Sequence, residues 1–358
     1  MAASEERRRA ADTAPLRIVQ VGLGNFGRSW LNEVLLEEPR IHLAAGVDVD
    51  PQAIEWAQAH SPLGAEQCFS SLDAALDSVA VDAVLITAPL SVHVPAAMTA
   101  LEAGKHVLVE KPFAPSLVEA EAVVDLAAQR GLVLMVSQNY RHFPAVRAAA
   151  SLVANERFGT LDTVHIGFRR YDNAAPHGER LHYLFAHPMV LDMAIHHFDL
   201  MRLVAGRGAE EIYCHAWNPP WSRFEEPAEA SAIVRFEGGV TVNYSGSWIS
   251  PGRPTPWAGE WRMELSHGEI TWTSRDGKPL DRADEAIVRP LGGSPERLEL
   301  PRIEHIDRAG TLHAFVEAVR GETEPETSGR QNLSTLALTL AAVESAQTGH
   351  PVSLLKRA

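Results

Sequence analysis

The stretch LRIVQVGLGNFGRSW, residues 16–30, decides the fold of this chain. Its first six residues form an apolar run that predicts a buried strand, and a helical pattern follows the glycines. In this Gly-x-Gly-x-x-Gly spacing the first glycine permits a tight turn, the second lets the backbone approach a phosphate, and the third lets helix and strand pack closely. Free N–H groups at the helix start would face a pyrophosphate. The stretch predicts a dinucleotide-binding loop, rather than a glycine-rich turn without a ligand, with contacts from Gly22, Gly24, Asn25, Phe26 and Gly27.

Four more apolar runs alternate with helical patterns downstream. The runs are HLAAGV, AVLIT, HVLVE and LVLMVS, at 42–47, 83–87, 106–110 and 132–137. Helical patterns follow Pro51 and cover about 93–103 and 116–130. Strands that alternate with helices imply βαβ units and a parallel sheet, whose right-handed crossovers bring the strand C-termini to one edge. We therefore predict a doubly wound Rossmann domain over residues 16–140.

The pattern changes after about Tyr140. Helical patterns at 144–154, 189–204, 312–320 and 333–347 surround strand-like runs, one at 163–171 and several between 211 and 274. This predicts an α+β domain with a largely antiparallel sheet over residues 141–358, and its C-terminal helices are candidates to pack back on the Rossmann domain. The charged residues 1–15 are expected to form a disordered tail. The predicted fold class is therefore α/β, with a second α+β domain.

Composition excludes several classes of protein. The formal net charge of −14 repels nucleic-acid phosphates, so DNA or RNA is not expected as a partner. No apolar run approaches the length that crosses a bilayer, and the start lacks the apolar segment of a secretory signal. Cys68 and Cys214 are far apart and have no Cys-x-x-Cys spacing, so neither a disulfide framework nor a zinc site is indicated. A reducing cytoplasm fits these features best.

Asp48 ends the second predicted strand, about 20 residues after the glycines, as a dinucleotide-binding fingerprint requires. Its carboxylate can accept hydrogen bonds from a ribose 2′-hydroxyl but would repel a 2′-phosphate, and no Arg or Lys follows it. This favours NAD over NADP. The alternative is that Asp48 only caps the next helix, a role for which Asp50, before Pro51, is the better candidate.

Glu110-Lys111-Pro112 ends another predicted parallel strand, on the same edge as the glycine loop. That strand lies past the switch point of the sheet, so the Lys111 ammonium would lie near the nicotinamide. Pro112 restricts Lys111 to extended geometry, and the bond before it is a candidate for a cis peptide. From spacing alone, an ordinary surface lysine is the stronger interpretation.

Asp192 and His196 are four residues apart in a predicted helix, so they share a face. An imidazole beside a carboxylate suits proton transfer near neutral pH. Two alternatives stay open on spacing alone: an ordinary ion pair on the helix surface, and a metal site that also uses His182 or His187. The metal interpretation lacks a recognisable ligand motif, and we predict no metal.

The motifs together resemble a known family, the glucose–fructose oxidoreductase / inositol dehydrogenase / rhizopine catabolism (Gfo/Idh/MocA) family. The resemblance covers nearly the whole chain from Leu16. Its most specific part is ALEAGKHVLVEKPFA at 100–114; the other parts are GLGNFG with Asp48, Thr87-Ala88-Pro89, QNYRHFPAV at 138–146, LDMAIHHFDL at 191–200, and the C-terminal AFVEAVRGETEPETSG and SAQTGHPVSL.

The resemblance implies a Rossmann domain, a second domain with a large open sheet, and dimers or tetramers formed through that sheet. It implies catalytic roles for Lys111, Asp192 and His196. It also adds to the cofactor site Thr87, Pro89, His93, Glu110, Lys111 and Asn139, and it implies a substrate site made by Tyr140, Arg141, Arg169, Asp172, Asp192 and His196. The chain departs from the family pattern where glycines are usual, at Ala186-His187-Pro188-Met189 and at Ala194, so the substrate is less certain than the reaction.

We therefore expect a nicotinamide-dependent dehydrogenase that acts, where the two domains meet, on a secondary hydroxyl of a sugar, glycoside or cyclic polyol. Six of the eight tryptophans lie between Trp217 and Trp272, where they could stack on a sugar ring, although core packing is the usual role of such residues. Two rival functions remain: an NAD-dependent glycosidase that oxidises its substrate transiently, and a non-enzymatic dinucleotide-binding regulator. The His-rich stretch from His177 to His187 has no assigned role.

Overall fold

The computed structural model describes residues 14–176, 180–321 and 323–355. It divides into two compact units. The first comprises the described residues up to Gln138 together with Arg308–Leu333, and the second comprises Asn139–Asp307 and the described residues from Ser334 onward. Most of the predicted N-terminal tail, residues 1–13, and His177 of the His-rich stretch lie outside the described residues.

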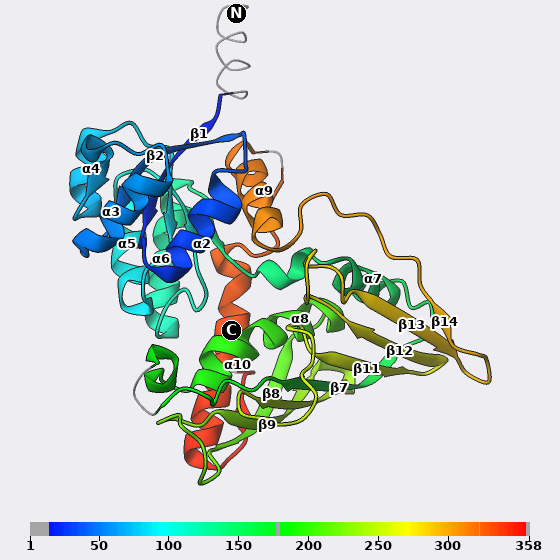
Figure 1. The fold of residues 1–358 in the computed structure, drawn as a ribbon. Helices are drawn as coiled ribbons and strands as arrows, with labels where there is room; N and C mark the ends of the chain where they lie inside the picture. The colour runs from blue at the N-terminus through cyan, green and yellow to red at the C-terminus, as the bar shows by residue number, and fades with distance from the viewer. Residues whose placement is uncertain (1–13, 177–179, 322, 356–358) are drawn as a thin grey trace, which may run out of the picture. The chain divides into compact units, whose positions relative to one another are not determined.

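The first unit contains a six-stranded sheet in the order β3-β2-β1-β4-β5-β6, in which every pair is parallel (Figure 1). Chain order reverses between β1 and β4, so the loops that follow these two strands lie side by side at the switch point. The doubly wound Rossmann prediction is confirmed. The strands are β1 (Leu16–Val21), β2 (Ile41–Val47), β3 (Cys68–Phe69), β4 (Ala83–Ile86), β5 (His106–Val109) and β6 (Leu134–Val136).

Helices connect these strands. They are α2 (Asn25–Trp30), α3 (Pro51–His60), α4 (Leu72–Ser78), α5 (Leu90–Glu102) and α6 (Leu117–Arg130). The sequence analysis missed β3 and α4, because a two-residue strand and a seven-residue helix carry too little periodicity to detect. Helix α9 (Asp307–Val319) places Leu312 and Phe315 in the same apolar core as Ile18 and Trp30, which explains why residues 308–333 belong to this unit.

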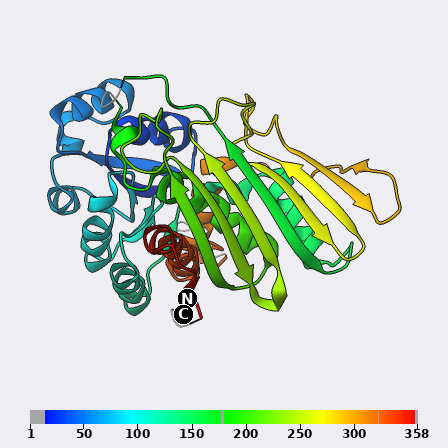
Figure 2. The ribbon, with the colours of Figure 1, turned by 90° about the horizontal axis from the view of Figure 1, so that it is seen from below.

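The second unit contains a nine-stranded sheet in the order β14-β13-β12-β11-β7-β10-β9-β8-β15 (Figure 2). Among the described strands of this second sheet, only β7 and β10 form a parallel pair, so the predicted, mostly antiparallel sheet is confirmed. The strands are β7 (Leu161–Arg169), β8 (Ala209–Trp217), β9 (Glu229–Phe236), β10 (Thr241–Ser247), β11 (Glu260–Leu265), β12 (Gly268–Thr273), β13 (Glu285–Pro290), β14 (Glu296–Arg297) and β15 (Val352–Ser353). The last three were not predicted.

Alternation along β7 shows that the two faces of this sheet differ. Val164, Ile166 and Phe168 are buried on one face, whereas His165 and Arg169 are partly exposed on the other. Helices α7 (Pro144–Ala154) and α8 (Ile195–Ala205) lie on the buried face. The other face is open among the described residues.

Two helices differ from their predicted form. The helix predicted over 189–204 consists of a π-helical segment, Pro188–Ala194, followed by α8. The last helix, α10 (Gly329–Thr348), begins four residues before its predicted start at Leu333. In the part of the chain that the structure describes, no helix combines the length and the apolar character needed to cross a lipid bilayer.

The glycine loop yields a first prediction. Gly22 has φ +92°, and a Cβ placed on it would lie 2.5 Å from the backbone nitrogen of Ala88. Gly22→Ala should therefore lower the free energy of unfolding by about 1–3 kcal/mol, measured by urea denaturation. Gly24→Ala is the matched control, because a Cβ there has nothing within 4 Å and its φ is −67°. Equal denaturation midpoints for Gly22→Ala and the wild type would contradict this account.

Candidate functional site

The candidate residues fall into two groups, one in each unit, and each group is described by itself. In the first unit, the glycine loop is shaped by contacts within the protein. A Cβ on Gly27 would collide with the carbonyl oxygen of Gly22, whereas a Cβ on Gly24 would meet open space. The buried Gln20 amide donates hydrogen bonds to the Gly27 carbonyl at 2.8 Å and to the Thr87 hydroxyl at 3.1 Å. The loop is therefore held close to its neighbours at both ends and left accessible at Gly24, the geometry that a pyrophosphate needs.

Asp48 lies at the end of β2, beside this loop. Its carboxylate accepts hydrogen bonds from the backbone N–H of Leu23, at 2.6 Å, and from that of Asp50, at 2.9 Å. The helix-capping role belongs to Asp50, whose side chain accepts a hydrogen bond from Gln52 N–H at the start of α3, with Pro51 as the first helical residue. Capping of α3 therefore does not account for Asp48.

Glu110 directly follows β5 and is 6% exposed. Its carboxylate accepts hydrogen bonds from Trp30 Nε1 at 2.8 Å and from the Lys111 N–H at 3.2 Å. Burial raises the pKa of Glu110. Glu110 thus links the end of β5 to α2, and its predicted contact with a cofactor stays a prediction.

His93, in the first turns of α5, joins two loops of the predicted cofactor site. Its ring nitrogens lie 2.8 Å from the Pro112 carbonyl oxygen and 2.8 Å from the Ala88 carbonyl oxygen. Burial lowers the pKa of His93. The Lys111-Pro112 peptide bond is cis, as anticipated. The ring of His93 therefore braces the loops after β4 and β5, while the exposed Pro89 begins α5.

In the second unit, Tyr140 and His196 form a flat stack. Their ring centroids are 4.1 Å apart and their planes differ by 3°. The Arg275 guanidinium lies 4.5 Å from the centre of the Tyr140 ring, and its Nη1 donates a hydrogen bond to the Tyr140 hydroxyl at 3.1 Å. Burial raises the pKa of Tyr140 to about 12, so the phenol keeps its proton. The stack fixes the orientation of the His196 imidazole, which is 7% exposed.

Asn139 and Arg141 flank Tyr140 in the chain, and the side chains of both donate hydrogen bonds to buried carboxylates. The Asn139 amide donates to Asp307. The Arg141 guanidinium donates to both oxygens of Asp199, at 2.6 and 2.8 Å, in a bidentate ion pair whose side chains are 8% and 2% exposed. These contacts give both residues a structural role, and their predicted ligand contacts stay predictions.

Arg169 does not join the Tyr140–His196 group. It lies on the open face of the sheet, where it donates to Glu260 at 2.5 Å. Strand residues alternate between faces, and the adjacent Arg170 takes the helix-covered side. The substrate contact of Arg169 stays a prediction. Arg170 lies 4.4 Å from the Trp257 ring, and its charge acts on Tyr140.

Asp172 and Asp192 are brought together by a residue that the sequence analysis named only as a metal ligand. His182 Nδ1 lies 2.9 Å from Asp172 Oδ2, and its Nε2 lies 3.4 Å from Asp192 Oδ2. Sequence reasoning also missed Trp257 and Arg275 as neighbours of the stack. Nothing local marks Arg275, which meets Tyr140 from 135 residues away.

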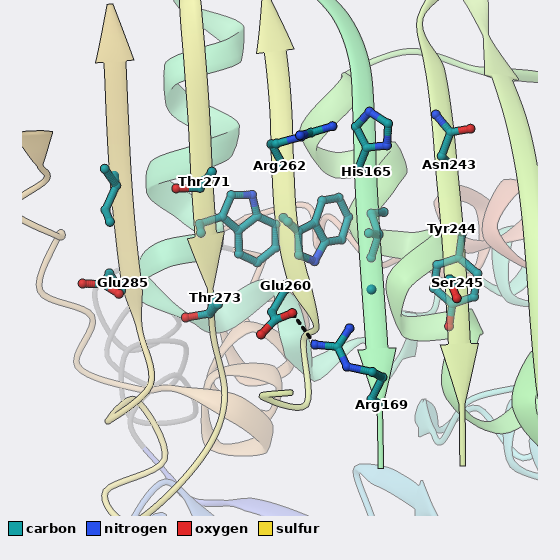
Figure 3. Close-up of a pocket in the computed structure, with 15 residues that line it drawn as sticks. His165, Arg169, Asn243, Tyr244, Ser245, Glu260, Arg262, Thr271, Thr273 and Glu285 are labelled. Carbon is teal, nitrogen blue, oxygen red and sulfur yellow. Dashed lines mark hydrogen bonds and ion pairs between the residues drawn. The ribbon is translucent and has the colours of Figure 1, made fainter. Parts of the chain in front are cut away.

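A groove of about 630 Å³ lies on the open face of the sheet (Figure 3). Arg169, His165, Arg262 and Asn243 line it from neighbouring strands. None of the three predicted catalytic residues is among its lining residues, and α8, which carries His196, covers the opposite face. The size of this groove does not make it the site of hydride transfer, because Lys111, Asp192 and His196 are not among its lining residues.

Comparison with known proteins places this fold and these motifs in a family. A model described as "Oxidoreductase family, NAD-binding Rossmann fold" matches residues 16–138, and one described as "GFO/IDH/MocA C-terminal domain" matches residues 146–270.

Two relatives match over nearly their whole length. A scyllo-inositol 2-dehydrogenase (NAD(+)) from Bacillus subtilis is 25% identical, with 96% of this chain and 98% of the relative covered. A D-xylose 1-dehydrogenase (NADP(+)) from Haloferax volcanii is 26% identical, with 93% and 98% covered.

A solved structure shares the fold. It is the crystal structure of an inositol dehydrogenase homologue from Azotobacter vinelandii, complexed with NADH and myo-inositol, which superposes with a TM-score of 0.81 at 19% identity and covers 95% of this chain and 98% of its own. With both family models matched in sequence along the chain, the protein belongs to the Gfo/Idh/MocA family of oxidoreductases and contains its NAD-binding Rossmann fold.

Proposed function

We propose that this oxidoreductase transfers hydride between a secondary hydroxyl of a sugar, glycoside or cyclic polyol and NAD. The observation that carries the proposal is the buried Tyr140–His196 stack with charged groups around it. Arg275 contacts Tyr140, and both Asp192 and Arg170 act on it electrostatically. A polyol presents several hydroxyls that such groups can bind, whereas an apolar ligand would leave them unpaired. Names of relatives that act on an inositol and on a pentose agree with this class.

Each catalytic residue has a distinct role in the proposed oxidation. His196 accepts the proton of the substrate hydroxyl, and the stack on Tyr140 holds its ring in orientation. The Lys111 ammonium stabilises the developing alkoxide. Asp192 binds a neighbouring hydroxyl or orients His196. The nicotinamide, held through the glycine loop and Asp48, supplies the hydride acceptor.

Asp48 supports NAD as the preferred cofactor. Its carboxylate is fixed beside Leu23 of the glycine loop, where it would accept hydrogen bonds from a ribose and repel a 2′-phosphate. Relatives in the family carry either cofactor in their names, so family membership alone does not decide between NAD and NADP.

The open face of the nine-stranded sheet supports a homodimer or homotetramer. The groove on that face has cations and carboxylates close together, as in the Arg169–Glu260 and Arg262–Glu264 ion pairs. A surface that carries both signs of charge can be complementary to a second copy of itself.

Two rival functions within the family are separable from this one. A glycosidase that oxidises its substrate transiently would release a free sugar without net formation of NADH. A non-enzymatic regulator would bind dinucleotide without turnover. The presence of Lys111, Asp192 and His196 favours the dehydrogenase.

The cofactor preference predicts that NAD binds more tightly than NADP. Titration of each dinucleotide against intrinsic tryptophan fluorescence gives the two dissociation constants. Asp48→Asn should narrow the difference, because the amide removes the repulsion of the 2′-phosphate while it keeps an oxygen that can accept from Leu23 N–H. Equal or tighter binding of NADP by the wild type would refute the assignment.

The role of Lys111 predicts a specific kinetic defect. Lys111→Ala should lower kcat/KM for the identified polyol by about 10²–10³, the worth of one positioned transition-state donor. The dissociation constant of NAD should change far less. Lys105→Ala, on the loop between α5 and β5, is a control that removes the same charge. Wild-type turnover in Lys111→Ala would rule out the catalytic role.

The substrate class and the base are tested together. A panel of sugars, glycosides and inositols with NAD should include a compound that forms NADH, while simple aliphatic alcohols react poorly. Protonation of His196 removes the base, so kcat/KM for oxidation should fall at low pH, and His196→Asn should flatten that limb without weakening NAD binding. The exposed His42, changed to Asn, is the control. Rapid oxidation of a simple alcohol with no activity on the panel would overturn the substrate class; an unchanged profile in His196→Asn would overturn the base.

A further inference from the structure

His182 is held by two carboxylates through opposite edges of its ring. Its Nδ1 lies 2.9 Å from Asp172 Oδ2, and its Nε2 lies 3.4 Å from Asp192 Oδ2. The ring is also packed between aromatic edges, with centroid distances of 5.2 Å to Phe224 and 4.8 Å to Trp248. The side chain is 24% exposed, so solvent screens these contacts only in part. His182 is therefore held by packing as well as by charge.

The charge of this ring follows from its partners. Nδ1 is within hydrogen-bond distance of Asp172, whereas Nε2 has a longer ion-pair contact with Asp192. Two carboxylates beside one imidazole favour its protonated form, because each attracts the positive charge. The two carboxylates raise the pKa of His182 although burial opposes them. Arg180 also pairs with Asp172. Phe224 and Trp248 add no charge. In the part of the chain that the structure describes, the charged groups that face His182 are Asp172 and Asp192, and Arg180 pairs with Asp172.

Two simpler interpretations fit less well. A metal ion needs its ligand atoms to converge on one point, whereas the two carboxylates approach opposite nitrogens of the same ring. A surface ion pair would leave the side chains free to move, whereas Phe224 and Trp248 hold the edges of the ring. The Trp248 indole is itself tied to the Pro188 carbonyl, at the start of the segment that carries Asp192.

We propose that His182 is a positioning residue for Asp192: anchored on Asp172, it holds the Asp192 carboxylate in place for a substrate hydroxyl. The inference rests on the proposed function, in which Asp192 acts in the substrate site. Of the three residues, only Asp192 belongs to the helical motif that resembles the family, and His182 comes from the His-rich stretch that had no assigned role.

The sign of the pH dependence follows from the raised pKa. Below that pKa the imidazolium is present and Asp192 keeps its partner. As pH rises through it, the ring loses a proton, one nitrogen stops donating, and the attraction to both carboxylates weakens. KM for the polyol should therefore rise on the alkaline side of the ordinary histidine pKa, about 6.5, while kcat changes less. Protonation of His182 should also stabilise the fold. That contribution is fully present at a pH below the His182 pKa of the unfolded chain, and it is lost as the pH rises through the higher pKa of the folded protein.

Steady-state kinetics with the panel substrate test the inference. His182→Ala should raise KM by about tenfold, because Asp192 loses a close charged partner, with a smaller effect on kcat and none on NAD affinity. His182→Gln keeps a hydrogen-bond donor but no charge, so its KM should lie between those of the wild type and His182→Ala. Like His182→Ala, it should lose the alkaline rise in KM. The exposed His215, changed to Gln, is the matched control. A wild-type KM and pH profile in folded His182→Ala would overturn the proposal.

A second measurement needs no substrate and no His182 variant. Nuclear magnetic resonance of the imidazole ring should give a His182 pKa above its ordinary value in the wild type. Asp172→Asn and Asp192→Asn should each lower it, and Asp172→Asn should move the alkaline limb of KM to lower pH. A His182 pKa that neither change moves would overturn the proposed clamp, in which Asp172 and Asp192 hold the two nitrogens of the His182 ring. If the clamp titrates as expected but no polyol is oxidised, the proposed function fails instead, so the two failures are distinguishable.

Discussion

The backbone at Gly22 lies so close to that of Ala88 that no side chain fits between them, and the ligand-binding edge of the first unit depends on this approach. It brings the loop after β1 against the loop after β4 at the point where strand order reverses. The side chains of Gln20 and Thr87 donate hydrogen bonds to carbonyl oxygens of the glycine loop, and His93 contacts the loop that follows β5. Contacts within the protein therefore fix the backbone of the glycine loop.

In the second unit, a buried ion pair holds the segment around Tyr140 in place. Arg141 and Asp199 bind each other through two hydrogen bonds, and Thr335 of α10 donates to the same carboxylate at 2.9 Å. Breaking such a pair leaves a buried charge without compensation, so the segment that carries Arg141 is held firmly on α8. Asp199 and His196 are three residues apart on that helix and share a face, so the pair also sets Tyr140 over His196.

The two faces of the nine-stranded sheet carry different kinds of residue. The covered face carries the aromatic and charged residues around His196, including Phe168, Trp248 and Arg170. The open face carries the polar groove and its ion pairs (Figure 3). The groove lacks the imidazole of His196, which lies on the covered face. The proposed function therefore depends on the chemistry of the residues rather than on the volume that they enclose.

The sequence by itself determined the features that depend on near neighbours in the chain: the glycine turn, the acid at the end of β2, the cap of α3 and the alternating strands. Strand and helix periods and turn sterics are local, so they can be read without a structure. Tertiary structure alone decided which distant groups meet. Asp172, His182 and Asp192 are ten residues apart at each step, and Arg275 reaches Tyr140 across 135 residues. The choice between Arg169 and Arg170 likewise depended on which face of the sheet the helices cover, because covering a face is a property of packing and leaves no mark on one strand.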